Sequence, residues 1–310
     1  MKRHLRRALA MLAVGGVAAV AAVAAAPGVA QATHFTDWNP AEPVPNVNDP
    51  VAADGCPIES PDGLSLYIAS TRGPGGDNDI WVATRADKGA EFGAATMLPE
   101  PVNSDAQDFC PTPLSGMSLL FVSDRGGTDA YGTVACGGGD IYLTRRSPAT
   151  GEWQAPRNLG CAPGGPNGPG TEYGPSLVET DAGTLLFFSS GGVVGTNTQD
   201  IYSSRQEADG SFGAPEPVTE LNSAFDDAMP NVSKDGREIV FTSNRPGGEG
   251  LFDIWSSTRN SVFEPWSSPV NLGTAINTAA PETRPSLSWG GERLYFGRAG
   301  DIYVSQRSKR

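Results

Sequence analysis

The chain has 310 residues, and its 35 acidic side chains outnumber the 22 basic ones, for a net charge of −13 at pH 7. So acidic a chain repels nucleic acid and anionic lipid, which disfavours both as partners. Glycine (39) and proline (26) are abundant, and no long segment has the apolar spacing of an amphipathic helix, which disfavours a helical protein.

The first residues have the layout of a secretory signal peptide. Four basic side chains come first: Lys2, Arg3, Arg6 and Arg7. An apolar, alanine-rich stretch from Leu9 to Val23 follows, and Ala30-Gln31-Ala32 has the small residues of a cleavage site. We therefore expect residues 1–32 to be removed and residues 33–310 to be exported, to the periplasm or the exterior. No second apolar stretch of membrane-spanning length follows, so we expect no membrane anchor after cleavage.

One motif, an Asp directly before Ile and an aromatic residue, occurs five times. Its copies begin at Asp79, Asp140, Asp200, Asp253 and Asp301. A proline opens each repeat: Pro57, Pro111, Pro175, Pro230 and Pro285. These prolines are 54, 64, 55 and 55 residues apart. A period of this size indicates one supersecondary unit copied in series.

The fourth copy shows the unit most clearly. Residues 230–233 and 238–243 are predicted strands joined by the turn Asp235-Gly236, a strong hairpin signal. A glycine-rich loop leads to a third strand over 253–258 and a fourth over 263–272. Four short antiparallel strands joined by turns are typical of a propeller blade. The sequence therefore predicts an all-β, five-bladed β-propeller of four-stranded antiparallel blades over residues 33–310.

The fifth copy ends after its third strand, and a matching fourth strand is found near the other end of the chain. The segment 38–48 has the length of 212–222, shares Glu-Pro-Val with it at the same place, and likewise starts with an aromatic residue and ends with Asn. We therefore expect the N-terminal strand to complete the last blade and close the ring. Closure removes exposed sheet edges, which otherwise promote aggregation.

Three elements carry a resemblance to a known family: Pro57 to Gly63 (Pro-x-x-Ser-x-Asp-Gly), Ser70-Thr71-Arg72, and the Asp-Ile-Tyr/Trp motif. Together they resemble the WD40-like (PD40-type) repeats of TolB-like propeller proteins, over residues 35–307. The resemblance implies the propeller fold and, for many relatives, a role as a protein-binding platform in the cell envelope. Other relatives carry a hydrolase domain after the propeller, which we do not expect here.

Four cysteines in an exported chain predict two disulfides. Three pairings are open from the sequence, and free thiols are the alternative. Cys56 and Cys110 occupy equivalent positions in neighbouring copies, and Cys136 and Cys161 lie in two long insertions of the second copy. We predict the bonds Cys56–Cys110 and Cys136–Cys161.

A carboxylate stands three residues before each opening proline. The five are Asp54, Asp108, Glu172, Asp227 and Glu282. Because the opening strand of a blade is innermost, we expect these side chains in the connectors at the rim of the channel. One interpretation is a ligand-binding ring, with calcium as the candidate ion and no other cofactor. The repetition favours the other, in which each carboxylate caps main-chain N–H groups or pairs with an arginine such as Arg72, Arg125 or Arg245.

Histidine is nearly absent, and after export only His34 remains. Catalysis by a Ser-His-Asp or Cys-His pair, or by zinc, is therefore disfavoured. The Asp of each Asp-Ile-aromatic motif is expected to fix a turn rather than to catalyse. The remaining enzymatic alternative is a carboxylate-dependent glycoside hydrolase or lyase at the channel mouth. It needs acids in unlike environments, whereas the repeat-equivalent acids are alike.

The second copy breaks the symmetry with a long loop, 126–139, and a long connector, 160–170. Both belong to the face that carries the five carboxylates, and Tyr131 lies in the loop. We therefore expect an exported, non-enzymatic binding or scaffold module that holds a protein or a cell-envelope glycan on this face. The expected contacts are Asp54, Asp108, Glu172, Asp227, Glu282 and Tyr131, no catalytic residue is assigned, and the oligomeric state is open.

Overall fold

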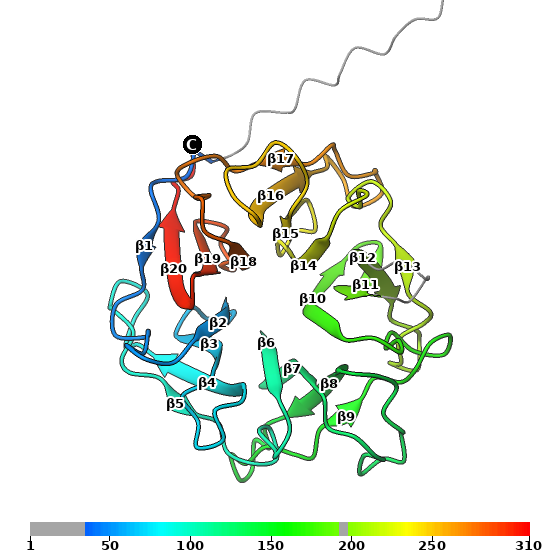
Figure 1. Cartoon of the computed structure of the whole chain (residues 1–310). Helices are drawn as coiled ribbons and strands as arrows, with labels where there is room; N and C mark the ends of the chain where they lie inside the picture. Colours follow the sequence, from blue (N-terminus) through cyan, green and yellow to red (C-terminus); the bar gives the residue numbers. More distant parts are fainter. Residues whose placement is uncertain (1–34, 192–197) are drawn as a thin grey trace, which may run out of the picture. The chain divides into compact units, whose positions relative to one another are not determined.

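The computed structural model describes residues 35–191 and 198–310; the predicted signal peptide and His34 lie outside them. The described residues form no helix, and therefore none that could cross a membrane. Their strands form five four-stranded antiparallel sheets in a ring (Figure 1). The predicted five-bladed propeller is confirmed.

The blades are numbered in chain order. Blade 1 comprises β2 (Asp54–Glu59), β3 (Ser65–Ser70), β4 (Asp79–Thr84) and β5 (Thr96–Met97). Blade 2 comprises β6 (Asp108–Leu114), β7 (Ser118–Ser123), β8 (Asp140–Arg145) and β9 (Arg157–Asn158). Blade 3 comprises β10 (Glu172–Thr180), β11 (Gly183–Gly191), β12 (Gln199–Arg205) and β13 (Glu216–Pro217). Blade 4 comprises β14 (Asp227–Val232), β15 (Glu238–Ser243), β16 (Asp253–Thr258) and β17 (Val270–Asn271). Blade 5 comprises β18 (Glu282–Leu287), β19 (Arg293–Arg298), β20 (Asp301–Gln306) and, from the N-terminal side, β1 (Glu42–Pro43).

The innermost strands start earlier than predicted. β14 begins at Asp227, three residues before Pro230, so the carboxylates open the strands instead of lying in the connectors. The pairing of β14 with β15 shifts between Ala228 and Asn231, and the other four inner strands shift at the same place. A proline has no N–H to give to a ladder, and this bulge lets pairing resume beyond it.

The fourth strands are shorter than predicted. β17 covers only Val270–Asn271, although a strand was expected over 263–272. Pro265 and Pro269 lack the N–H that a longer ladder would need. Trp266 between them turns inward and is buried against the sheets of blades 3 and 4.

The N-terminal strand closes the ring as predicted. Glu42 pairs with Val304 and Pro43 with Tyr303, so β1 lies beside β20 (Figure 1). The Val44 N–H donates to the Ile302 carbonyl at 2.9 Å. The last blade is therefore made from both ends of the described chain.

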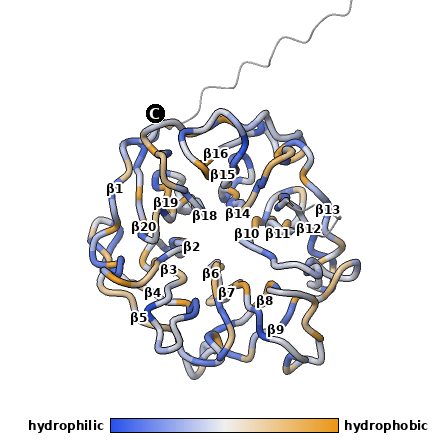
Figure 2. The backbone as a smooth tube through the Cα atoms, in the orientation of Figure 1, coloured by the Kyte–Doolittle hydropathy of each residue, from blue (hydrophilic) through white to orange (hydrophobic). Residues whose placement is uncertain are grey.

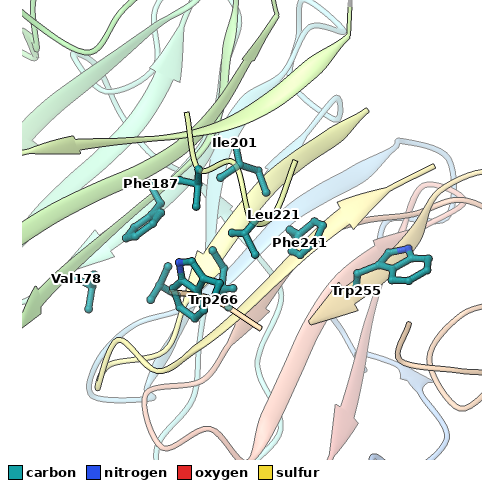
Figure 3. Packing of buried hydrophobic residues seen from close by; sticks show 10 residues of the cluster. Val178, Phe187, Ile201, Leu221, Phe241, Trp255 and Trp266 are labelled. Atoms are coloured by element: carbon teal, nitrogen blue, oxygen red, sulfur yellow. The ribbon is translucent and has the colours of Figure 1, made fainter. Parts of the chain in front are cut away.

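The hydrophobic core lies between neighbouring blades, and hydrophobic segments occur in all five (Figure 2). Between blades 3 and 4, Phe187 and Trp266 meet edge to face at 6.4 Å, beside Phe241 (Figure 3). A single sheet cannot bury both faces alone, so each blade depends on its neighbours.

Candidate functional site

The five predicted carboxylates are buried, with 0–3% of each residue exposed. Each accepts a hydrogen bond from a main-chain N–H of the connector before it. Ser104 donates to Asp108 at 2.7 Å, Ser223 to Asp227 at 2.6 Å, and Thr278 to Glu282 at 3.1 Å. The carboxylates therefore fasten the connectors to the inner strands.

Four of the five carboxylates pair with an arginine. The Arg72 Nη2–Asp54 distance is 2.5 Å and the Arg125 Nη2–Asp108 distance is 2.6 Å. Arg245 pairs with Asp227 in the same way. The Nη2 group of each of these three arginines also donates to a main-chain carbonyl of the connector, as Arg72 does to Val47. These are the contacts of the capping interpretation.

Blade 5 makes the same link with a shifted arginine. Arg298 stands opposite Glu282 in the sheet, where other blades have serine, and its Nε lies 2.8 Å from Glu282 Oε1. The acid is one methylene longer here than in blades 1, 2 and 4. The longer side chain matches an arginine that stands two residues earlier.

Glu172 in blade 3 is the exception. Its Oε1 accepts from the Gly168 N–H at 3.0 Å and the Ser190 hydroxyl at 2.9 Å, but no described residue hydrogen-bonds to its buried Oε2. Burial raises the pKa of Glu172 to about 8, and the nearby Asp140 adds to this effect. Glu172 is therefore largely protonated at neutral pH.

The residues that precede the prolines bring neighbouring blades into contact. All five have positive φ, between 48° and 61°: Cys56, Cys110, Gly174, Met229 and Arg284. Cys56 and Cys110 form a disulfide between blades 1 and 2, as predicted. The fully buried Arg284 donates to the Pro230 carbonyl at 3.1 Å, and burial lowers its pKa to about 9.

The second disulfide, Cys136–Cys161, joins the two insertions of blade 2, again as predicted. Asp129 organises the loop between β7 and β8, since its Oδ1 accepts from the N–H groups of Tyr131 and Thr133, both at 2.8 Å. Tyr131 is 56% exposed, and its hydroxyl donates to the Ala155 carbonyl at 3.3 Å. The loop is thus fixed at both ends and presents Tyr131 to solvent.

Tyr131 is one of several exposed apolar side chains on this face, which we call the loop face: the loops between second and third strands and the connectors between blades. In a four-stranded antiparallel blade these segments leave from the same end. The exposed apolar residues there are Val51, Tyr131, Val134, Phe225 and Leu251, with 42–94% of each residue exposed. Sequence reasoning found Tyr131 but not the others, because single apolar residues in loops carry no pattern.

A groove between blades 1 and 2 was also missed. It encloses about 670 Å³ and is lined by the blade 1 sheet and by Arg146, Glu152 and Trp153 of blade 2. Its residues come from strands and turns about 50 to 90 positions apart in the sequence. Position 65 carries only part of the signal: it holds a serine, as does the equivalent Ser118 of blade 2, whereas blades 4 and 5 have Glu238 and Arg293 there.

No group of three or more Asp, Glu, His or Cys suited to a metal ion occurs within 35–191 and 198–310. No family model matches the chain, and no curated protein matches it.

Solved structures share the fold at low identity. A protein assigned as TolB from Agrobacterium tumefaciens is 18% identical over 84% of this chain and 77% of its own, with a TM-score of 0.47. An α-L-arabinofuranosidase from Lactobacillus brevis is 11% identical over 86% and 94%, with a TM-score of 0.53. A thermostable family-43 glycoside hydrolase is 13% identical over 86% and 92%, with a TM-score of 0.51. The likeness to the last two structures shows the propeller fold alone, and one fold serves many activities.

Proposed function

We propose that the chain is an exported, non-enzymatic binding module that holds a partner protein on its loop face. The observation that carries this proposal is the set of exposed apolar side chains on rigidly anchored loops, Tyr131 and Leu251 among them, at 56% and 72% exposure. Binding residues are commonly found on loops that a rigid scaffold positions. Exposed apolar residues on such loops favour a protein partner over a glycan.

Export is part of the proposal. It is supported by the signal-peptide pattern of residues 1–32 and by two disulfides, which persist in oxidising compartments. The resemblance to TolB-like repeats supports the same role, since relatives of that kind act as protein platforms.

The burial of the carboxylates argues against the enzymatic alternative. A glycoside hydrolase or lyase needs two acids that reach the substrate. Asp54, Asp108, Asp227 and Glu282 are committed to arginines, and Glu172, whose raised pKa would suit a general acid, has no exposed surface. We therefore assign the five carboxylates to holding the loop face in place rather than to contacting the ligand.

The test is affinity capture from the envelope and culture fluid of the producing cells, with the mature chain as bait. We expect a protein retained by the wild type to be lost with Tyr131→Ser/Leu251→Ser. Phe263→Ser is the matched control, because Phe263 is 74% exposed in the β16–β17 loop at the opposite end of the blade. Equal retention by all three baits, or turnover of a glycan by the wild type, would contradict the proposal.

A further inference from the structure

One side of the blade 1 sheet forms the floor of the groove between blades 1 and 2, and Pro99, Glu100 and Pro101 of the connector between these blades line its edge. Ser65 stands across from Thr84, and Val82 stands between Tyr67 and Thr96 in adjacent strands. These five side chains lie on the face of the sheet that lines the groove. The floor therefore presents hydroxyl groups around an apolar centre.

At another boundary of the propeller, the gap equivalent to this groove is filled by a pair of charged side chains. Glu238 opens β15 as Ser65 opens β3, and each pairs with the last residue of the third strand. Glu238 reaches Arg307 of blade 5 through two bonds of 2.9 and 2.6 Å. Arg146 holds the position of Arg307 in blade 2. Its counterpart across the boundary is Ser65, whose short side chain leaves the gap open.

A second boundary is closed by a different contact at the same position. Arg293, the equivalent of Ser65 in blade 5, donates to the Lys88 carbonyl of blade 1 at 2.8 Å. Tyr295 beside it donates to Glu59 at 2.6 Å. At these two boundaries a long side chain at the position of Ser65 spans the gap, whereas Ser65 itself is too short to do so between blades 1 and 2.

The aromatic residue of blade 2 is also uncovered. An arginine lies over the equivalent ring in three blades, at 4.3, 4.1 and 4.2 Å: Arg85 over Phe92, Arg259 over Trp266 and Arg307 over Trp38. In blade 2, Arg146 instead donates through Nε to the Gly151 carbonyl of its own turn. Within residues 35–191 and 198–310 no cation lies over Trp153, which remains partly exposed and lines the groove.

We propose that this groove binds a neutral glycan, with one sugar ring stacked on Trp153. An aromatic face suits the apolar face of a pyranose, and hydroxyl, guanidinium and carboxylate groups around it can bond to sugar hydroxyls. Arg146, Glu152 and Glu100 place both signs of charge at the rim, which favours an uncharged ligand over an acidic one. The volume lies in the range of small-ligand sites.

The first test screens the mature wild-type chain on an array of neutral hexose and pentose oligosaccharides, uronate-bearing oligosaccharides and peptidoglycan fragments. We expect signal on neutral oligosaccharides. Signal confined to acidic glycans, or no signal on any neutral one, would overturn the proposal.

The second test places the ligand, by titration calorimetry with the strongest neutral oligosaccharide. Trp153→Ala should weaken binding about tenfold or more. Ser65→Glu should abolish it without loss of stability, because the new carboxylate can pair with Arg146 as Glu238 pairs with Arg307. Trp289→Ala is the control, since Trp289 is exposed in the β18–β19 turn. Unchanged affinity in Ser65→Glu, or equal loss in the control, would overturn the proposal. Tyr131→Ser/Leu251→Ser should bind the sugar normally, which separates this site from the loop face.

Discussion

The side-chain amide of Asn48 is bonded to both main-chain groups of Ile302, 254 residues away. Asn48 Oδ1 accepts from the Ile302 N–H at 2.7 Å, and Nδ2 donates to the Ile302 carbonyl at 3.1 Å. The other four blades have the same pair of hydrogen bonds between an asparagine side chain and an isoleucine main chain: Asn103 to Ile80, Asn167 to Ile141, Asn222 to Ile201 and Asn277 to Ile254. Asn48 differs in that it joins the N-terminal segment of the described chain to its C-terminal strand.

Asn48→Ala should therefore destabilise the fold and open it locally. The buried Ile302 N–H loses its partner and the Ile302 carbonyl keeps only the Val44 N–H, which costs about 1–3 kcal/mol. Urea unfolding measures the loss, and hydrogen exchange should show faster exchange in residues 35–48. Asn277→Ala is the matched control: it should lower stability comparably while leaving exchange of 35–48 unchanged. Identical exchange profiles for the two variants would contradict a closing role for Asn48.

The Arg245–Asp227 pair should matter far more than a surface pair. Arg245→Met leaves a buried carboxylate without its cation, which typically costs 3–5 kcal/mol. The double variant Arg245→Met/Asp227→Asn should recover part of that loss, because no unpaired charge remains. Arg237→Met is the control: the Arg237–Asp235 pair is about half exposed and should contribute less than about 1 kcal/mol. Thermal or urea unfolding of the four proteins distinguishes these outcomes.

Calcium should leave the melting temperature unchanged. The oxygens of Asp54, Asp108, Asp227 and Glu282 are occupied by arginines and main-chain N–H groups, so a cation would have to displace those partners. Calorimetric melting in millimolar calcium and in excess chelator provides the measurement. A rise of several degrees with calcium, absent with magnesium, would show that the ring binds the ion.

Much of the fold could be predicted because each repeat carries the same recognisable residues. Five prolines and five Asp-Ile-aromatic motifs gave the number of blades, and the likeness of 38–48 to 212–222 gave the closure. The strand ends could not be predicted from Pro230, since the bulge that carries pairing past it depends on the positive φ of Met229.

The candidate site was less accessible to such reasoning. The ring of carboxylates is visible in the sequence, but their burial depends on arginines 16–18 residues away and on the connectors folding over them. Arg284 has no sequence signal, because its burial comes from neighbouring blades meeting at the axis. Gly174 gives room there: a Cβ at Gly174 would stand 3.0 Å from Arg284 Nη1 and 2.6 Å from Met229 Cα.

The unpaired carboxyl of Glu172 should make stability fall as the pH rises. Its ordinary pKa is 4.5, and burial raises it to about 8 in the folded chain. Between these values the unfolded chain has lost the proton and the folded chain has kept it, so the contribution is complete below pH 4.5 and lost through pH 8. Glu172→Gln removes this dependence and should be more stable than the wild type at pH 8, by on the order of 3 kcal/mol.

The measurement is urea unfolding from pH 5 to 9, taken as the difference between the two proteins. Glu179→Gln, an exposed change on the same strand, is the control and should follow the wild type. A difference that stays constant from pH 5 to 9 would show that Glu172 does not hold its proton in the folded protein.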